Sequence, residues 1–307
     1  SEGEERELLI LLEEICWKHP EQAHEFRTDH SLFGEYSRGF PLHSLCSTAC
    51  TLSSVRALIA ANPGALKSTN KEKMTPLHIF VECGAKNSSQ PDRIPIFRTL
   101  LFGYPDAVKL ADDDGWIPLH TVTYIKDLQV AWDLLVLHPE GATFRGKSIR
   151  SSVLQWVCSG PSEYIHEFQT LAGHITNGKD LSPEARTDEF WDLESTKAAG
   201  VGVCRDVLKW AVAQLLLMAA HHGSVPKQIP PSKFFESTRD GIVLDGMVLE
   251  GGEVYRSVHA SAAMGVSSQV VVLAMTARPS QITETDEKGR LPLHLTAGVI
   301  HPDMFWC

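Results

Sequence analysis

The sequence predicts an all-α protein, a solenoid of stacked helix pairs, and a repeated tripeptide is the first reason. Pro-Leu-His occurs four times, at Pro41-Leu42-His43, Pro76-Leu77-His78, Pro118-Leu119-His120 and Pro292-Leu293-His294. The first two copies are 35 residues apart, and the third follows 42 residues later. Self-similarity at a period of roughly 30 to 40 residues is typical of helical repeats, whose units bury their apolar faces only by stacking on one another.

A second signal keeps step with the first. The prolines of Asn62-Pro63, Tyr104-Pro105 and Arg278-Pro279 each end an apolar stretch and lie 13 residues before the proline of a Pro-Leu-His. A proline cannot continue a helix, and it biases the residue before it away from helical geometry. Each unit is therefore interpreted as two short helices, which in the first full unit span about 42–49 and 53–61.

The tripeptide has the chemistry of a helix start. Proline suits the first helical position because its missing N–H would be unpaired there in any case. Thr75 precedes one copy and can cap that helix by accepting a backbone N–H. Phe40, Ile117 and Leu291 hold the same position in the other copies and cannot cap. There we expect the histidine and the turn before it to stabilise the helix start.

The residues around three of the tripeptides resemble the ankyrin repeat, whose core pattern is Asp-x-x-Gly-x-Thr-Pro-Leu-His. Residues 112–120 and 286–294 depart from this pattern only at the position of the threonine. Residues 70–78 keep the threonine but have Lys73 in place of the glycine. The resemblance implies helix-turn-helix units joined by projecting turns, and a protein-binding role without catalysis.

The resemblance covers residues 1–180 and 254–307, including two weaker copies. Ser152-Val153-Leu154-Gln155-Trp156 begins a degenerate unit over about 147–180, and Ser257-Val258-His259 lies 35 residues before the last Pro-Leu-His. A polar stretch at 85–93 lengthens the second unit, and we expect it to be an exposed loop.

Residues 181–253 break the pattern and are expected to be an irregular or inserted segment. Residues 188–193 and 207–220 predict two helices, and the second is apolar but too short to span a bilayer, so we expect it in the core. Asp245-Gly246 between two apolar runs predicts a short β-hairpin over 242–249. The 104 residues from Val153 to Ser257 are close to three periods. The segment is therefore either two decorated repeats or a small insertion.

The ankyrin resemblance also implies which residues face a partner protein. They lie in the projecting turns, next to the start of the following helix, and are Lys73, Met74, Asp114, Trp116, Lys288 and Arg290. Tryptophan and arginine often dominate binding energy because they bury a large area around a polar group. The alternative for Trp116 is that it packs against the neighbouring turn and only stabilises the stack.

Composition excludes several classes of protein. The formal net charge of −10, from 28 basic and 38 acidic residues, argues against nucleic acid as a partner. The apolar 207–220 helix has no basic face, which argues against binding to a membrane surface. We expect a monomer that binds other proteins.

The chain has seven cysteines, an odd number scattered through apolar segments. This pattern indicates reduced, buried thiols and an intracellular protein, cytoplasmic or nuclear. Cys46 and Cys50 lie one helical turn apart, a spacing that half of a zinc ligand set could have, but no second Cys or His pair has the required spacing. We therefore expect neither a metal nor a cofactor.

The catalytic motifs sought in the sequence are missing, so the prediction is a non-catalytic interaction scaffold. There is no complete dinucleotide fingerprint, phosphate-binding loop or nucleophile elbow. His221-His222 is the best remaining candidate for chemistry. It supports the alternative that 181–253 is an enzyme or regulated domain for which the repeats are a targeting arm. The unit that begins at Pro292 stops before a second helix, so we expect a piece of a longer protein.

Overall fold

The described part of the chain is helical. The computed structural model describes four single residues near the start (14, 18, 19 and 21) and the ranges 40–48, 50–83, 92–125, 128–147, 151–159, 162–177, 205–226, 247–249 and 252–298. Within these ranges there are twelve α-helices, four short 3-10 helices and, in place of strands, two isolated β-bridges. The prediction of an all-α fold is confirmed to that extent.

Contacts divide the chain into two compact units. Unit 1 comprises residues 1–125 with 146–148, and unit 2 comprises 126–145 with 149–307. The domain boundaries expected from the sequence, near residues 180 and 253, remain a prediction.

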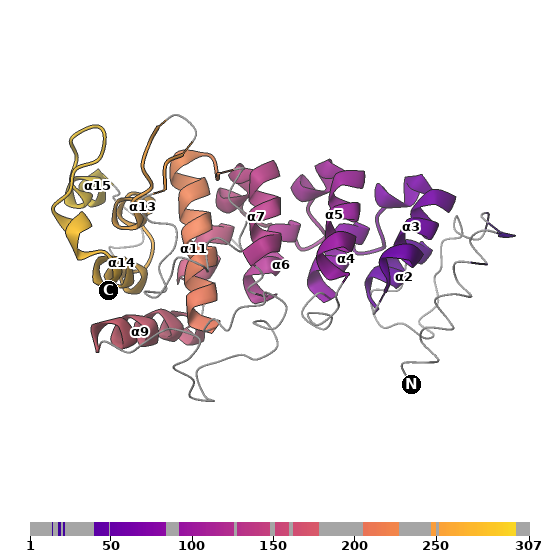
Figure 1. The fold of residues 1–307 in the computed structure, drawn as a ribbon, viewed down its shortest axis with the longest axis horizontal. Coiled ribbons are helices and arrows are strands. Elements are labelled where there is room, and N and C mark those ends of the chain that lie inside the picture. Colours follow the sequence, from indigo (N-terminus) through magenta and orange to yellow (C-terminus); the bar gives the residue numbers. More distant parts are fainter. Residues whose placement is uncertain are drawn as a thin grey trace. The chain divides into compact units, whose positions relative to one another are not determined.

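The described ranges of unit 1 contain two helix pairs and the first helix of a third. Its elements are α2 (Pro41–Cys46), α3 (Leu52–Ala61), η3 (Pro63–Leu66), α4 (Pro76–Cys83), α5 (Arg93–Gly103), η4 (Pro105–Lys109) and α6 (Pro118–Ile125). The helices that begin with Pro-Leu-His stack in order, with α2 on α4 and α4 on α6, while α3 packs on α5 (Figure 1). Each of the three tripeptides of unit 1 therefore begins a helix whose leucine and histidine are buried in the stack.

Unit 2 contains the remaining helices. They are α7 (Leu128–Leu137), η5 (Pro139–Thr143), α8 (Val153–Ser159), α9 (Ser162–Thr176), α11 (Arg205–His222), α13 (Ser257–Met264), α14 (Ser268–Ala277), η6 (Pro279–Ile282) and α15 (Pro292–Gly298). Helix α11 packs on α7, α8 and α13, and α13 packs on α15. Helix α14 packs on α9, although about ninety residues separate them in the chain.

The prolines predicted to end each second helix do so, and they also begin a new element. The residue before each proline is no longer in a helical conformation, since φ is near −140° at Asn62, Tyr104 and Arg278. The proline that follows each of them starts a short 3-10 helix. His138-Pro139 does the same before η5. The fixed φ of proline thus ends one helix and supplies the first residue of the next turn.

A reciprocal set of hydrogen bonds fixes the start of α4. The backbone N–H of Thr75 donates to Nδ1 of His78 (3.2 Å), and the N–H of His78 donates to the Thr75 hydroxyl oxygen (3.4 Å). This is a capping box with histidine in the usual place of glutamate. Because Nδ1 accepts, the ring proton is on Nε2, which donates to the carbonyl of Leu110 (3.0 Å). One buried imidazole therefore ties its own helix to the segment before the next one.

A second motif histidine is placed to make the same hydrogen bond to a carbonyl before the next helix, and the number of residues between the two partners follows the length of the unit. His43 Nε2 lies 3.2 Å from the carbonyl oxygen of Ser68, 25 residues further on. The offset from His78 to Leu110 is 32 residues, which is 25 plus the 7 residues by which the second unit is longer. The histidines therefore occupy equivalent positions in successive units.

Two of the three Pro-Leu-His helix starts without threonine keep half of this arrangement, whereas at α2 His43 Nδ1 has no hydrogen-bond partner among the described residues. The backbone N–H groups of Ile117 and Leu291 donate to Nδ1 of His120 (3.1 Å) and of His294 (3.0 Å). The expectation that histidine compensates for the missing cap is confirmed at both positions. At the end of unit 2, however, Leu293 is 75% exposed, because no described helix covers that face of α15.

The degenerate copy at Ser152 is a complete capping box. The Ser152 hydroxyl oxygen accepts from the N–H of Gln155 (3.2 Å), and the Gln155 side-chain oxygen accepts from the N–H of Ser152 (3.1 Å). Glutamine here takes the place of the histidine. The decayed sequence retains the hydrogen bonds that start the helix, and α8 begins at Val153 as expected.

Helix α11 is buried, as its apolar sequence predicts. Lys209, 3% exposed, interrupts the apolar run, but its ammonium group lies 2.9 Å from Glu167 and 4.6 Å from the centre of the Phe168 ring. The buried charge is thus matched by a carboxylate and an aromatic face. Among the described helices, none is both long enough and apolar enough to cross a membrane.

Several predicted elements lie outside the described residues. They are most of the N-terminal helix, the loop before Asp92, the helix at 188–193 and the first strand of the hairpin at 242–249. Arg93, expected at the end of that loop, is the first residue of α5. Near the predicted hairpin, the pairing that the structure describes is a single antiparallel bridge between Val248 and Val254.

The buried histidines predict that the protein loses stability in mild acid. Burial lowers the pKa of His43, His78 and His120 from 6.5 to about 4. Between these values the unfolded chain binds more protons than the folded one, so stability is full above pH 6.5 and falls toward pH 4. Each histidine contributes at most about 3 kcal/mol. Urea unfolding at a series of pH values measures this slope.

A control variant separates these histidines from the carboxylates. His78→Gln retains a capping oxygen, as Gln155 does, but removes one titrating imidazole. We expect a shallower loss of stability between pH 6.5 and 4.5 than in the unmodified protein. Identical slopes for the two proteins would contradict a stabilising role for the neutral His78 ring.

Candidate functional site

A five-residue turn of the same conformation precedes three of the Pro-Leu-His helices. It spans residues 70–74, 112–116 and 286–290. In each turn the N–H of the first residue donates to the carbonyl of the fifth at 2.9 Å. The side-chain oxygen of the first residue, an Asn or Asp, accepts the N–H of the fifth at 2.7–2.8 Å. The turns that the resemblance implies are therefore held by their own hydrogen bonds.

The fourth residue of each turn has a left-handed backbone. The φ angle is 83° at Gly115, 71° at Gly289 and 59° at Lys73. A residue with a side chain is strained in this conformation, so Lys73 is the departure from the repeat pattern that costs stability. Part of the same pattern recurs before α13, where the N–H of Leu249 donates to the carbonyl of Glu253 (2.8 Å) and Gly252 has a φ of 88°.

In unit 1 the first two turns are joined to each other. The N–H of Asp113 donates to the carbonyl of Glu72 (3.0 Å), and the Asp113 carboxylate pairs with Lys73. The exposed side chains beside this joint, together with the half-buried Trp116, form what we call the unit 1 turn surface. It consists of Lys71, Lys73, Asp113, Asp114 and Trp116.

Of the six turn residues predicted to face a partner, five are at least partly exposed and one is buried. Lys73, Asp114 and Lys288 are exposed, and Trp116 and Arg290 are partly exposed. Met74, in contrast, is 6% exposed and belongs to the core of unit 1, so its side chain is not available to a partner. An unbranched apolar side chain at this position gains more from burial than from exposure to water.

Trp116 has a contact that bears on both of its proposed roles. Its ring stacks on the imidazole of His120, with the centroids 5.8 Å apart and an angle of 29° between the planes. The indole therefore supports the helix start while part of its surface stays open to solvent. Packing and partner contact are compatible at this residue.

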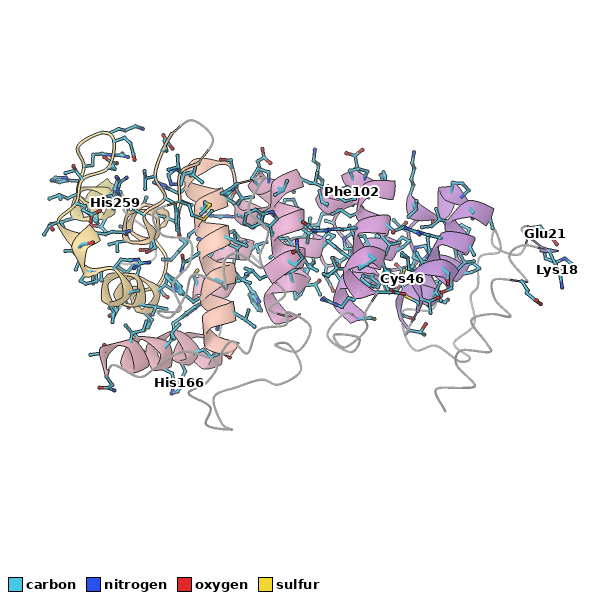
Figure 2. All side chains as sticks on the ribbon, viewed as in Figure 1. Lys18, Glu21, Cys46, Phe102, His166 and His259 are labelled. Carbon is cyan, nitrogen blue, oxygen red and sulfur yellow. The ribbon has the colours of Figure 1, made fainter. Side chains whose placement is uncertain are left out.

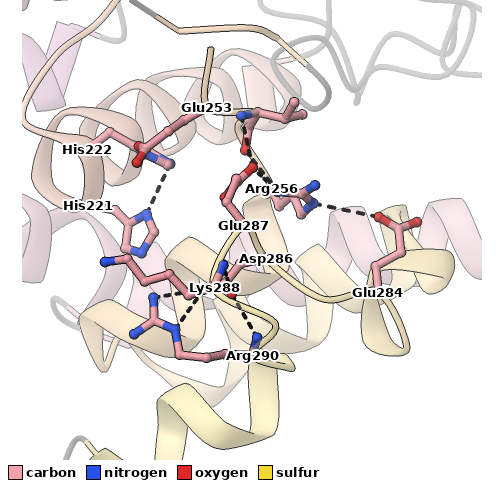
Figure 3. Close-up of polar contacts among 10 residues, drawn as sticks. His221, His222, Glu253, Arg256, Glu284, Asp286, Glu287, Lys288 and Arg290 are labelled. Carbon is pink, nitrogen blue, oxygen red and sulfur yellow. Dashed lines mark hydrogen bonds and ion pairs between the residues drawn. The ribbon is translucent and has the colours of Figure 1, made fainter. Parts of the chain in front are cut away.

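In unit 2 the equivalent region holds a pocket of about 110 Å³ (Figure 3). The end of α11, the segment before α13, α13 itself and the last turn surround it. We call it the unit 2 pocket. Its lining residues are His221, His222, Glu253, Val254, Arg256, His259, Asp286, Glu287, Lys288 and Arg290.

Ion pairs organise the acidic side of the unit 2 pocket. Arg290 pairs with Asp286 at 2.7 Å, and Arg256 pairs with Glu287 at 2.7 Å. At Asp286 burial raises the pKa, but N–H donors of Arg290 and Lys288 outweigh it and lower the pKa to about 2. The hydrogen bond from Arg256 lowers the pKa of Glu287 to about 2. Both carboxylates are therefore charged at neutral pH.

Two histidines and Glu253 form a hydrogen-bonded chain. His222 Nδ1 lies 2.8 Å from the Glu253 carboxylate, and His222 Nε2 lies 3.0 Å from His221 Nδ1. With both rings neutral, each Nδ1 carries the proton, which leaves Nε2 of His221 as an acceptor. Burial, followed by the nearby His222 and Arg290, lowers the pKa of His221 to about 4.

His259 is the buried member of the unit 2 pocket (Figure 2). It is 2% exposed, and neither ring nitrogen makes a hydrogen bond to a described residue. Burial lowers its pKa, against the opposing effect of the Arg290 and Glu284 backbones. Glu284 lies 25 residues after His259, the offset from His43 to Ser68. His259 is therefore a motif histidine whose ring makes neither of the hydrogen bonds that His78 makes.

The cysteines give no sign of a metal centre in the described ranges. Cys46, Cys50, Cys83 and Cys158 are free and buried, as predicted, and Cys46 lies inside unit 1 (Figure 2). Burial raises the pKa of Cys50 and of Cys158 to about 12. No group of three or more His, Cys, Asp or Glu side chains in the described ranges can hold a metal ion.

Comparison with known proteins does not assign this chain to a family. No family model matches this chain, and no curated protein matches it. Sequence reasoning singled out Lys288 and Arg290 and separately His221 and His222, but it did not place the four in one pocket. It missed Glu253, Arg256 and His259. The constant offset after each motif histidine is the signal that could have connected His259 to the last turn.

The left-handed turn position predicts two glycine variants of unequal cost. An added Cβ at Gly115 would lie 2.3 Å from the backbone nitrogen of Lys147, whereas nothing lies within 4 Å at Gly289. We expect Gly115→Ala to lower the free energy of unfolding by about 2–4 kcal/mol, from strain and overpacking. Gly289→Ala, which adds only strain, should cost about 1–2 kcal/mol. Equal losses in urea unfolding would contradict this account.

The first residue of the last turn provides a second prediction. Asp286→Ala removes the acceptor of two backbone N–H groups and should lower the free energy of unfolding by about 1–2 kcal/mol. Asp286→Asn keeps that acceptor, as Asn70 does in the first turn, and loses only the partly exposed pair with Arg290, worth below about 1 kcal/mol. Thermal melts of both variants measure the difference. A larger loss for the asparagine variant would assign the stability to the ion pair.

Proposed function

We propose that the chain is an ankyrin-type helical repeat solenoid that binds partner proteins through its projecting turns and catalyses no reaction. The observation that supports this best is the recurrence of one turn conformation, with the same hydrogen bonds, before three helices that start with Pro-Leu-His. The side chains at the second and third positions of these turns differ and are mostly exposed. A constant backbone that displays variable side chains suits recognition.

The rigidity of the turns is the physical argument for binding. An interface loses free energy when it must order loops and side chains on association. Here the Asn or Asp side chain, the left-handed fourth residue and the joint between Glu72 and Asp113 have already ordered the backbone. Trp116 and Arg290 provide the large side chains that often dominate binding energy.

The remaining features of the proposal are a monomer, an intracellular location in cytoplasm or nucleus, and no nucleic acid partner. The four described cysteines are free thiols with little exposure, which suits a reducing compartment. The formal net charge of −10 disfavours contact with phosphate backbones.

The second candidate function is an enzyme in residues 181–253. The chain from Glu253 through His222 to His221 favours it, because a carboxylate that orients an imidazole is a common arrangement for a general base. The described lining of the unit 2 pocket, however, offers no hydroxyl or thiol side chain as a nucleophile. Binding is therefore the better supported function.

Affinity capture with matched variants tests the proposed function. Trp116→Ala and Arg290→Ala each truncate a turn side chain and should reduce the amount of captured partner at least about fivefold, as expected for an interface residue worth 1 kcal/mol or more. Phe102→Ala on α5, 62% exposed, is the control in unit 1 (Figure 2). Val272→Ala on α14, 47% exposed, is the control in unit 2. They should leave capture unchanged.

Circular dichroism melts of all four variants establish that each remains folded. A captured protein that is lost with the turn variants and kept with the helix variants would assign binding to the turns. Equal capture by every variant would reject the turns as the binding surface and direct attention to 181–253. A lower melting temperature together with unchanged capture would assign Trp116 to packing alone.

A further inference from the structure

The carboxylates of the unit 2 pocket are already engaged. Asp286 accepts from the guanidinium of Arg290, Glu287 from that of Arg256, and Glu253 from His222 (Figure 3). A cation entering the pocket would compete with these partners for the same oxygens. The acidic groups therefore do not make this a cation site.

Several donors of the same pocket are unused. The exposed ammonium group of Lys288 makes no ion pair with a described residue, and Lys288 lines the pocket. Arg290 contacts Asp286 through Nε and Nη2, so the two N–H groups of Nη1 are available to donate to a ligand. His259, buried and without a hydrogen bond, must carry at least one further N–H.

The unused N–H donors of the unit 2 pocket indicate that its ligand carries hydrogen-bond acceptors with negative charge. Carboxylate oxygens accept hydrogen bonds from ammonium, guanidinium and imidazole groups, and such charge-assisted bonds are about twice as strong as neutral ones. A single carboxylate can lie between Lys288 and Arg290 and reach toward His259, and a pocket of about 110 Å³ accommodates a group of that size.

We propose that the unit 2 pocket binds an acidic side chain of the partner protein, with Lys288, Arg290 and His259 as its donors. This rests on the proposed function, because the pocket lies beside the last projecting turn and a partner crossing that turn would carry the carboxylate. The nearby Asp286 and Glu287 weaken the attraction, so the contact contributes specificity more than affinity and is sensitive to salt.

The turns of unit 1 have a different charge. Asp114 stands where unit 2 has Lys288, and Trp116 stands where it has Arg290. Lys73 is neutralised by its pair with Asp113. The unit 1 turn surface therefore lacks the unused cationic pair, and the acidic contact is assigned to unit 2 alone.

Fluorescence anisotropy with two rhodamine-labelled peptides tests the proposal on the full chain. One peptide alternates Glu and Gly, and the control peptide alternates Gln and Gly. The unmodified protein should bind the Glu peptide at least about tenfold more tightly. Lys288→Glu should weaken that binding roughly fivefold, since removing and then reversing one exposed charge contact changes it by a few-fold. Lys288→Arg should restore it to within about twofold.

Lys109→Glu is the matched control, because Lys109 is an exposed lysine of η4, outside the projecting turns, and should leave binding unchanged. Equal affinity for the two peptides would overturn the proposal, as would equal losses in the Lys109 and Lys288 variants. Competition by inorganic phosphate at lower concentration than by the Glu peptide would overturn the assignment to a protein segment.

The two proposals can fail separately. The peptide assay reads the unit 2 pocket without any cellular partner, whereas capture with Trp116→Ala reads the turns of unit 1. Peptide binding that depends on Lys288 would support the acidic-side-chain site even if the turn variants captured as much partner as the unmodified protein. Loss of partner capture by the turn variants, with no peptide binding, would support the interaction scaffold and contradict the acidic-side-chain site.

Discussion

The hydrogen bonds of the motif histidines are the interaction on which the helix stack depends. A helix start leaves backbone N–H groups without partners, and a buried start must supply acceptors for them. His78 does this with Nδ1 and uses Nε2 to reach the carbonyl of Leu110. Because one neutral ring does both, the helix cap and the connection between successive helix pairs are formed by the same residue.

This dual use explains which sequence changes the fold tolerates. The cap position accepts Ile117 or Leu291, because the histidine still receives the N–H of that residue. The histidine position accepts Gln155 when Ser152 restores the other half of the capping box. At the starts of α4, α6, α8 and α15, a side-chain acceptor three residues into the helix receives the N–H of the cap residue, while the rest of the motif varies.

The sequence predicted those features that depend on neighbouring residues. Prolines marked helix starts and ends, and the apolar run at 207–220 marked α11, because these effects act over a few residues. It did not predict that α14 packs on α9 or that Met74 is buried, since both depend on which surfaces meet after folding. The unit 2 pocket belongs to this second kind, because its lining residues come from four separate segments.

In the unit 2 pocket a histidine of the motif has a different hydrogen-bond environment from its counterpart in unit 1. In unit 1 the ring of His78 is fully used by Thr75 and Leu110. His259 occupies the equivalent position, but its ring makes neither bond with described residues. The start of α13 also lacks the hydrogen bond of a side-chain cap, since Arg256 occupies the cap position. A hydrogen-bonding capacity that stabilises the stack elsewhere is thus available to a ligand here, beside two cations that the turn itself presents.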